Sequence, residues 1–135
     1  KETGPRLYGD GRHIRDWIHV TDHIRAIWTI LHHGRIGQTY LVSAENQASN
    51  LEVVHLILDL MGHPMDDYDL VADRPGHDLR YALDCTRTRE ELGWHPQYTD
   101  LRAGLADTID WYRANEAWWR PDKAAPEASY ARTGQ

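Results

Sequence analysis

The stretch Arg12-His-Ile-Arg-Asp-Trp-Ile-His-Val-Thr-Asp-His23 decides how this chain begins to fold. It follows Gly9-Asp-Gly11, which is typical of a tight turn because glycine and aspartate tolerate positive φ. Apolar and charged residues mix on both sides of this turn without a helical period. The pattern predicts two short strands, at 7–8 and at about 12–20.

Two charged residues, Arg15 and Asp16, lie inside the second of these otherwise apolar strands. A charge that leaves water needs a partner, because burial of an unpaired charge is costly. Arg15 is therefore either part of an ion pair with Asp16 or Asp22, or the binding group for an anion. Spacing alone does not separate these two interpretations.

A helix is expected from about residue 22 to residue 33, with Thr21 or Asp22 as its N-cap, since a short side-chain oxygen can accept an orphan backbone N–H. Its apolar residues recur every three or four positions and predict one packed face. Gly34 is the expected C-cap in the left-handed conformation. The residues of the expected packed face are Ile24, Ile27, Trp28 and Leu31.

The rest of the chain reads as alternating short elements without an internal repeat or a domain linker. A buried strand is expected at 38–43, a polar loop at 44–49 and a charge-dense loop at 73–81. Asn50 is the expected N-cap of the next helix. The remaining expected elements are a helix to residue 61, a strand at 69–72, and helices at 86–92 and from 100 to 118 or 119, stopped by Pro121.

The composition limits the function classes. With 21 acidic and 15 basic residues, a net charge of −6 argues against nucleic-acid binding. The single Cys85 excludes an intrachain disulfide and favours a reducing compartment, so we expect the cytoplasm. No apolar run approaches a membrane span, and no signal peptide is seen at the N-terminus. The chain opens at Lys1 without Met, and we expect it to be a piece of a longer protein.

No catalytic, cofactor or metal motif is visible in the sequence. The nine histidines lack zinc-like spacing, so ordinary polar or packing roles are the favoured interpretation. There is no P-loop, and no glycine-rich turn opens a helix after a strand. We therefore expect no catalytic residue, no cofactor-binding residue and no metal ligand in this chain.

An anion-binding set remains: Arg15, Asn50, Arg74 and His77. Arginine and helix N-termini are the two common ways to hold phosphate. The simpler alternatives are a plain N-cap for Asn50 and a solvated turn for Arg74 and His77, and the residues alone favour them. Tyr8 either stacks on a base or packs, and packing is the default.

Three segments together resemble the dTDP-glucose 4,6-dehydratases, which are extended short-chain dehydrogenase/reductases. The segments are 7–23, 74–84 (Arg-Pro-Gly-His-Asp-Leu-Arg-Tyr-Ala-Leu-Asp) and 91–96 (Glu-Leu-Gly-Trp-His-Pro). The resemblance implies an α/β fold, namely the C-terminal substrate-binding part of such an enzyme, with helices, a few short strands and no Rossmann core. It implies a nucleotide-sugar-binding domain at 1–121 and a polar tail at 122–135, which we expect to be poorly ordered.

In that family the Rossmann domain binds NAD and the C-terminal part binds the nucleotide sugar, so this resemblance implies no catalytic residue here. The family reaction oxidises the sugar at C4, eliminates water across C5–C6 and returns hydride to C6. The resemblance matches Arg15 and Arg74 to the family's diphosphate clamp, Asn50 to a residue near the same phosphates, and His77 to the same loop. Tyr8 matches the aromatic residue beside the thymine.

The implied partner is a dTDP-sugar, with no nucleic acid and no membrane, and the full-length protein is expected to be a homodimer in rhamnose biosynthesis. NAD is expected on the missing N-terminal domain only, and the fragment alone is expected to be inactive. Two alternatives stay open: the C-terminal part of another sugar-nucleotide epimerase or decarboxylase, and a non-enzymatic binding module. Strand 38–43 should belong to a sheet that is otherwise absent, which predicts an exposed apolar edge or a partner chain.

Overall fold

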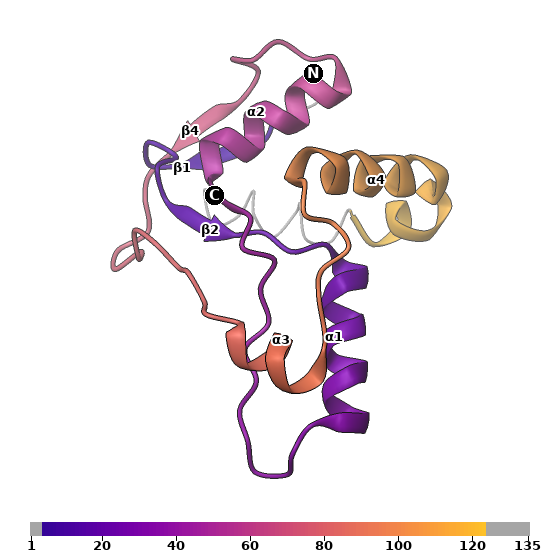
Figure 1. The fold of residues 1–135 in the computed structure, drawn as a ribbon. Coiled ribbons are helices and arrows are strands. Elements are labelled where there is room, and N and C mark those ends of the chain that lie inside the picture. Colours follow the sequence, from indigo (N-terminus) through magenta and orange to yellow (C-terminus); the bar gives the residue numbers. More distant parts are fainter. Residues whose placement is uncertain (1–3, 124–135) are drawn as a thin grey trace.

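The computed structural model describes residues 4–123 and shows a helix-rich α/β fold with short strands (Figure 1). This is the fold class that the sequence predicted. Residues 124–135, which make up most of the expected polar tail, lie outside the described residues. In chain order the elements are β1 (Arg6–Tyr8), β2 (Ile14–Asp16), α1 (Val20–His33), β3 (Gln47–Ser49), α2 (Asn50–Met61), β4 (Asp69–Val71), α3 (Thr86–Leu92) and α4 (Leu101–Ala114).

Two small strand pairs organise the upper half of the molecule in Figure 1. β1 runs parallel to β4, with the buried Leu7 opposite Leu70. β2 runs antiparallel to β3, so the stretch at 47–49 that was expected to be loop is a strand. The other edge of β2 is covered by the loop 73–81, because the Ile14 N–H donates to the carbonyl of Leu79 and the Tyr81 N–H donates to the carbonyl of Ile14.

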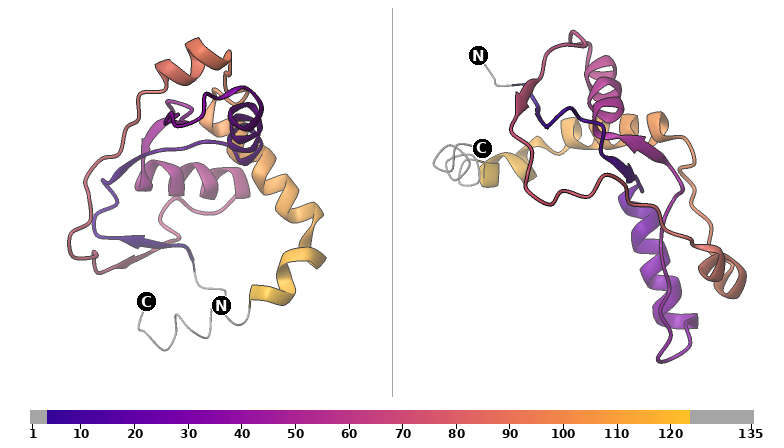
Figure 2. Two further views of the ribbon diagram at one scale, coloured as in Figure 1. Left: turned by 90° about the horizontal axis from the view of Figure 1, so that it is seen from below. Right: turned by 90° about the vertical axis from the view of Figure 1, so that its left-hand side faces the viewer.

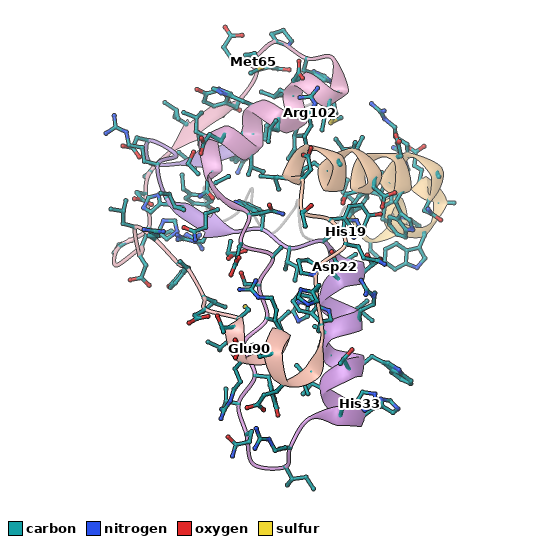
Figure 3. The ribbon with its side chains drawn as sticks, viewed as in Figure 1. His19, Asp22, His33, Met65, Glu90 and Arg102 are labelled. Carbon is teal, nitrogen blue, oxygen red and sulfur yellow. The ribbon has the colours of Figure 1, made fainter. Side chains whose placement is uncertain are left out.

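The start of α1 differs from the prediction. The helix begins at Val20, and its cap is the imidazole of His19, whose Nδ1 accepts from the Thr21 N–H. Asp22 is fully buried inside the first turn, where its carboxylate accepts from the backbone N–H groups of Gln97 and Tyr98. Figure 3 shows His19 and Asp22 at the end of α1 that meets the connector into α4. The carboxylate joins two distant segments, which no local capping rule could reveal.

The apolar stripe of α1 has the predicted period but is not packed. Its four side chains, Ile24, Ile27, Trp28 and Leu31, are 54–74% exposed, and the buried face of the helix carries Asp22 and Ala26. The right-hand view of Figure 2 shows α1 extending away from the body that holds α2. An exposed stripe of this length is typical of a surface that another part of a protein covers.

The segment 38–43 is not a strand, which corrects the prediction, because no strand of the described residues pairs with it. It follows α1 in extended form and is held by α3 instead. The Thr88 hydroxyl donates to the carbonyl of Leu41 at 2.6 Å, and the Tyr40 hydroxyl donates to the carboxylate of Glu91 at 3.0 Å. Leu41 is 42% exposed. The segment exposes an apolar side chain, but the strand whose edge was predicted to be exposed is not formed.

Exposure of this face has a measurable consequence. We expect the double substitution of Ile27 and Leu31 by lysine to change the free energy of unfolding by less than about 0.5 kcal/mol, because neither side chain leaves a packed environment. The same change should reduce binding of a hydrophobic dye to the folded chain. Urea unfolding and dye fluorescence measure the two effects. A matched double change at the buried Val53 and Leu58 should unfold the chain.

Gly34 is the C-cap of α1, as predicted, but its φ of −68° is not left-handed. A side chain is excluded there because a Cβ would lie 2.5 Å from the carbonyl oxygen of Ile30. Two other predicted helix ends need correction. Ser49 caps α2 in a capping box with Glu52, so Asn50 is the first helical residue and not the cap. α4 stops at Ala114, and a second helical segment at 116–123 contains the proline that was expected to end the helix.

Candidate ligand-binding site

Four of the five predicted site residues lie in the loop 73–81 or contact it. Near its start, the Arg74 guanidinium carbon lies 4.7 Å from the centroid of the Tyr8 ring. At its end, the Tyr81 ring lies under Arg15, with the guanidinium carbon 4.5 Å from the ring centroid. The two arginines, which are far apart in sequence, are thus attached to the two ends of one nine-residue loop.

The hydrogen bonds of Arg15 show that it does not form the ion pair with Asp16 or Asp22 that its spacing allowed. Its Nη1 donates to the carbonyl of Ile14 at 2.7 Å, and its Nη2 donates to the carbonyl of Asp78 at 2.9 Å. No carboxylate of the described residues lies within ion-pair distance of it. Asp16 instead accepts a hydrogen bond from Ser43, and Asp22 binds the 97–98 backbone. The charge of Arg15 is held in place but not neutralised, as an anion-binding group requires.

A histidine pair and a carboxylate lie next to Arg74. His77 Nδ1 donates to Asp73 Oδ1 at 2.9 Å, and His13 Nε2 lies 3.3 Å from Asp73 Oδ2. The two imidazoles stack, with ring centroids 3.9 Å apart and an interplanar angle of 21°. The hydrogen bond from His77, together with that from the backbone N–H of Arg74, lowers the pKa of Asp73. Asp73 is therefore an ionised acceptor that fixes both rings.

Gly9 allows Asp73 to lie close to the backbone of the turn between β1 and β2. It has φ +59°, and a Cβ there would lie 3.1 Å from the carboxylate of Asp73. Its N–H also donates to the carbonyl of Val71, two residues before Asp73. The turn predicted between β1 and β2 therefore packs against the start of the loop 73–81 and holds it in place.

Asn50 joins the site through the backbone. Its N–H donates to the carbonyl of His13 at 3.0 Å, and its side chain makes no hydrogen bond among the described residues. Because Ser49 supplies the cap, the Asn50 amide remains available to a ligand. Of the five predicted residues, Arg74 and His77 lie in the loop 73–81, and Tyr8 and Arg15 contact it. Asn50 is linked to the loop only indirectly, through the backbone of His13, whose ring stacks on His77.

Sequence reasoning missed three participants: His13, Asp73 and Tyr81. The spacing of Asp73 and His77 around Pro75-Gly76 was a usable signal, because a tight turn brings such residues together. His13 gave no signal, since its partner is distant in sequence.

His13, Asp73 and His77 are also close enough to be considered for a metal ion, with one ligand atom from each within 4.8 Å of the others. The two stacked rings direct their nitrogens at opposite oxygens of one carboxylate. That arrangement is a hydrogen-bonded unit, since a shared ion needs lone pairs that converge on one point. We therefore assign these residues to hydrogen bonding.

The fold is that of the C-terminal part of the extended short-chain dehydrogenase/reductases. A sequence model of the family described as GDP-mannose 4,6 dehydratase matches residues 1–108, and the chain belongs to this family. It is 59% identical over 131 residues to a dTDP-glucose 4,6-dehydratase of Mycolicibacterium smegmatis, and 55% identical to one of Mycobacterium tuberculosis. Each alignment covers 97% of this chain and 40% of the relative.

Solved structures give the same relationship. A dTDP-glucose 4,6-dehydratase of Bacillus anthracis, in complex with NAD, superposes with a TM-score of 0.80 at 45% identity, over 89% of this chain and 38% of the other. A dTDP-glucose 4,6-dehydratase of Streptomyces venezuelae, with NAD and TYD bound, has a TM-score of 0.80 at 43% identity, over 87% and 37%. The chain corresponds to the C-terminal part of these enzymes.

Proposed function

We propose that this chain is the nucleotide-sugar-binding part of a dTDP-glucose 4,6-dehydratase, which converts dTDP-glucose to dTDP-4-keto-6-deoxyglucose. The observation that carries the proposal is the loop 73–81, which holds Arg74 against Tyr8 and Arg15 against Tyr81. Its relatives with 59% and 55% identity are enzymes of that name, and this supports dTDP-glucose as the substrate.

The chemistry of the site fits a diphosphate. Two adjacent phosphates carry two negative charges, and a guanidinium can donate two parallel hydrogen bonds to phosphate oxygens. In our proposal Arg15 and Arg74 hold these oxygens, with the Asn50 amide and His77 as further donors. Tyr8 supports the base through its ring. An acidic chain can bind an anion in this way because the positive charge is local.

The residues of this chain bind and orient the substrate, and they do not supply the redox chemistry. NAD accepts hydride from the sugar and returns it when bound to such an enzyme. A dinucleotide-binding turn is rich in glycine and joins a strand to a helix. The turn Gly9-Asp-Gly11 instead joins the strands β1 and β2, and no glycine-rich turn within residues 4–123 joins a strand to a helix. The described residues therefore do not form a dinucleotide-binding turn.

The exposed face of α1 and the segment 38–43 support a further element of the proposal. We propose that the NAD-binding part covers them in the full-length protein, which acts in the cytoplasm as a homodimer. The support is the length that the relatives have beyond this chain, together with a long apolar stripe that is 54–74% exposed. A strand added beside 38–43 would satisfy its free backbone groups.

The proposal predicts a chain that binds the substrate and does not convert it. We expect the purified 135-residue chain to bind dTDP-glucose weakly and to give no turnover with added NAD, because it contributes binding groups only. Mass spectrometry of the sugar nucleotide measures turnover, and calorimetry measures binding. The Mycolicibacterium smegmatis relative is the positive control. Dehydration by the chain alone, or equal binding of UDP-glucose and dTDP-glucose, would contradict the proposal.

A further inference from the structure

The two histidines of the site differ in what surrounds their second nitrogen. His13 is 6% exposed, and its Nδ1 is buried without a hydrogen-bond partner. His77 has its Nδ1 on Asp73, while its Nε2 makes no hydrogen bond among the described residues and is not enclosed as His13 Nδ1 is. The far nitrogen of His13 is therefore enclosed, whereas that of His77 is not, although the two side chains are similarly buried, at 8% and 12% exposed.

This difference decides which ring can take up a proton. A carboxylate only accepts hydrogen bonds, so the His13 and His77 nitrogens that face Asp73 both carry hydrogen. A second proton on His13 would place a charged N–H in a buried position with no acceptor, which is costly. A second proton on His77 would place the N–H at the open nitrogen. The stacked rings, 3.9 Å apart, also oppose charging both.

We infer that His77 gains one proton when the diphosphate binds, and that His13 remains neutral and holds His77 in position. The inference rests on the proposed function, since it concerns the same site. The protonated His77 then donates from Nε2 to a phosphate oxygen while Nδ1 stays on Asp73. Histidine is the side chain whose ordinary pKa, about 6.5, allows such a change near neutral pH.

The charged groups around His77 are consistent with this assignment. Asp73 contacts it from the same loop and carries a negative charge, since its pKa is lowered. His13 faces it from the turn after β1, where Arg12 is paired with Asp10. On the loop, Arg74 lies over Tyr8, and Asp78 accepts from the Tyr81 hydroxyl. The open nitrogen of His77 therefore has a ligand phosphate as its expected partner.

Calorimetry of the 135-residue chain with dTDP-glucose tests the inference. This ligand has no group that titrates near neutral pH, because both phosphates are esterified, so any proton taken up goes to the protein. Titrations in two buffers with different ionisation enthalpies give the number of protons directly. We expect about one proton per ligand at neutral pH, and an affinity that rises up to about 100-fold from pH 8 to pH 6, because one proton taken up per ligand changes the affinity about tenfold per pH unit.

Matched variants assign the proton. His77→Gln should reduce the uptake to near zero and flatten the pH dependence. His13→Gln should weaken binding but keep the uptake, because His77 still takes the proton. His63→Gln changes a histidine that pairs with Asp67 away from this loop, and should alter nothing.

The possible outcomes distinguish a failure of the His77 protonation from a failure of the proposed function. Binding without proton uptake, or uptake that His13→Gln abolishes and His77→Gln does not, would overturn the inference and leave the proposed function in place. The absence of any binding by the folded chain would overturn both.

Discussion

Replacement of Asp22 by alanine is expected to unfold the chain. The carboxylate is fully buried and accepts from three donor groups: the backbone N–H of Gln97 at 2.9 Å, the backbone N–H of Tyr98 at 2.9 Å and the guanidinium of Arg25 at 2.9 Å. Loss of the acceptor leaves two backbone N–H groups unsatisfied in a buried position. Each buried donor left without an acceptor costs about 1–3 kcal/mol, so the loss of two such bonds is a large fraction of the stability of a small domain.

Urea unfolding followed by circular dichroism measures this effect. Asp22→Asn keeps one acceptor oxygen and should fall between the wild type and the alanine variant. Asp59→Ala is the matched control, because Asp59 also pairs with an arginine, Arg102, but both side chains are about half exposed. A surface pair of this kind contributes little, and the unfolding midpoint should not move. Equal midpoints for Asp22→Ala and Asp59→Ala would show that the 97–98 connector does not depend on the carboxylate.

Asp22 also shows where sequence reasoning stops. Its position before an apolar helical period placed the helix start two residues after Val20, where the helix begins, and the capping rule assigned Asp22 the wrong role. The buried carboxylate binds backbone that lies 75 residues away in sequence. Local patterns report local hydrogen bonds, so a long-range acceptor looks the same in the sequence as a cap.

The apolar stripe of α1 could be predicted in its spacing but not in its burial. Its period depends on the helix alone and was predicted, but its burial depends on what packs against it. The sequence of 38–43 is likewise β-rich, and yet the segment forms no ladder within residues 4–123, because a strand needs a neighbour. Both segments specify contacts that the described residues do not complete.

For the site, the residue types were predictable and their connections were not. Arginine, asparagine and histidine in turns and at a helix start indicate anion binding from the sequence alone, although the simpler alternatives were favoured there. The structure adds that Arg15 is bonded to the carbonyl of Asp78 and not to a carboxylate, and that Asp73 orders His77. These contacts depend on how the loop 73–81 lies beside β2, which only the folded chain defines.

The affinity for dTDP-glucose should depend on Arg15 and Arg74 more than on any other pair of residues. We expect Arg15→Ala and Arg74→Ala each to lower the affinity about 10- to 100-fold, since a charge-assisted hydrogen bond contributes about 1.5–3 kcal/mol. Lysine at either position should restore part of the loss, because it keeps the charge and loses the planar fork. Calorimetry measures these constants, and Arg102→Ala is the control for a surface arginine in an ion pair away from the loop.

The double variant distinguishes a shared clamp from two independent contacts. If both arginines hold one diphosphate, the ligand can shift toward the remaining guanidinium in a single variant, and the effects of the two changes will not add. If each binds a separate group, the losses will add within about 0.5 kcal/mol. The proposed clamp predicts coupling, because both side chains would then contact the same diphosphate; they stack on aromatic rings at the two ends of one loop, at 4.5 and 4.7 Å. Unchanged affinity in both single variants would remove the clamp, and the loop would then be a structural brace for β1 and β2.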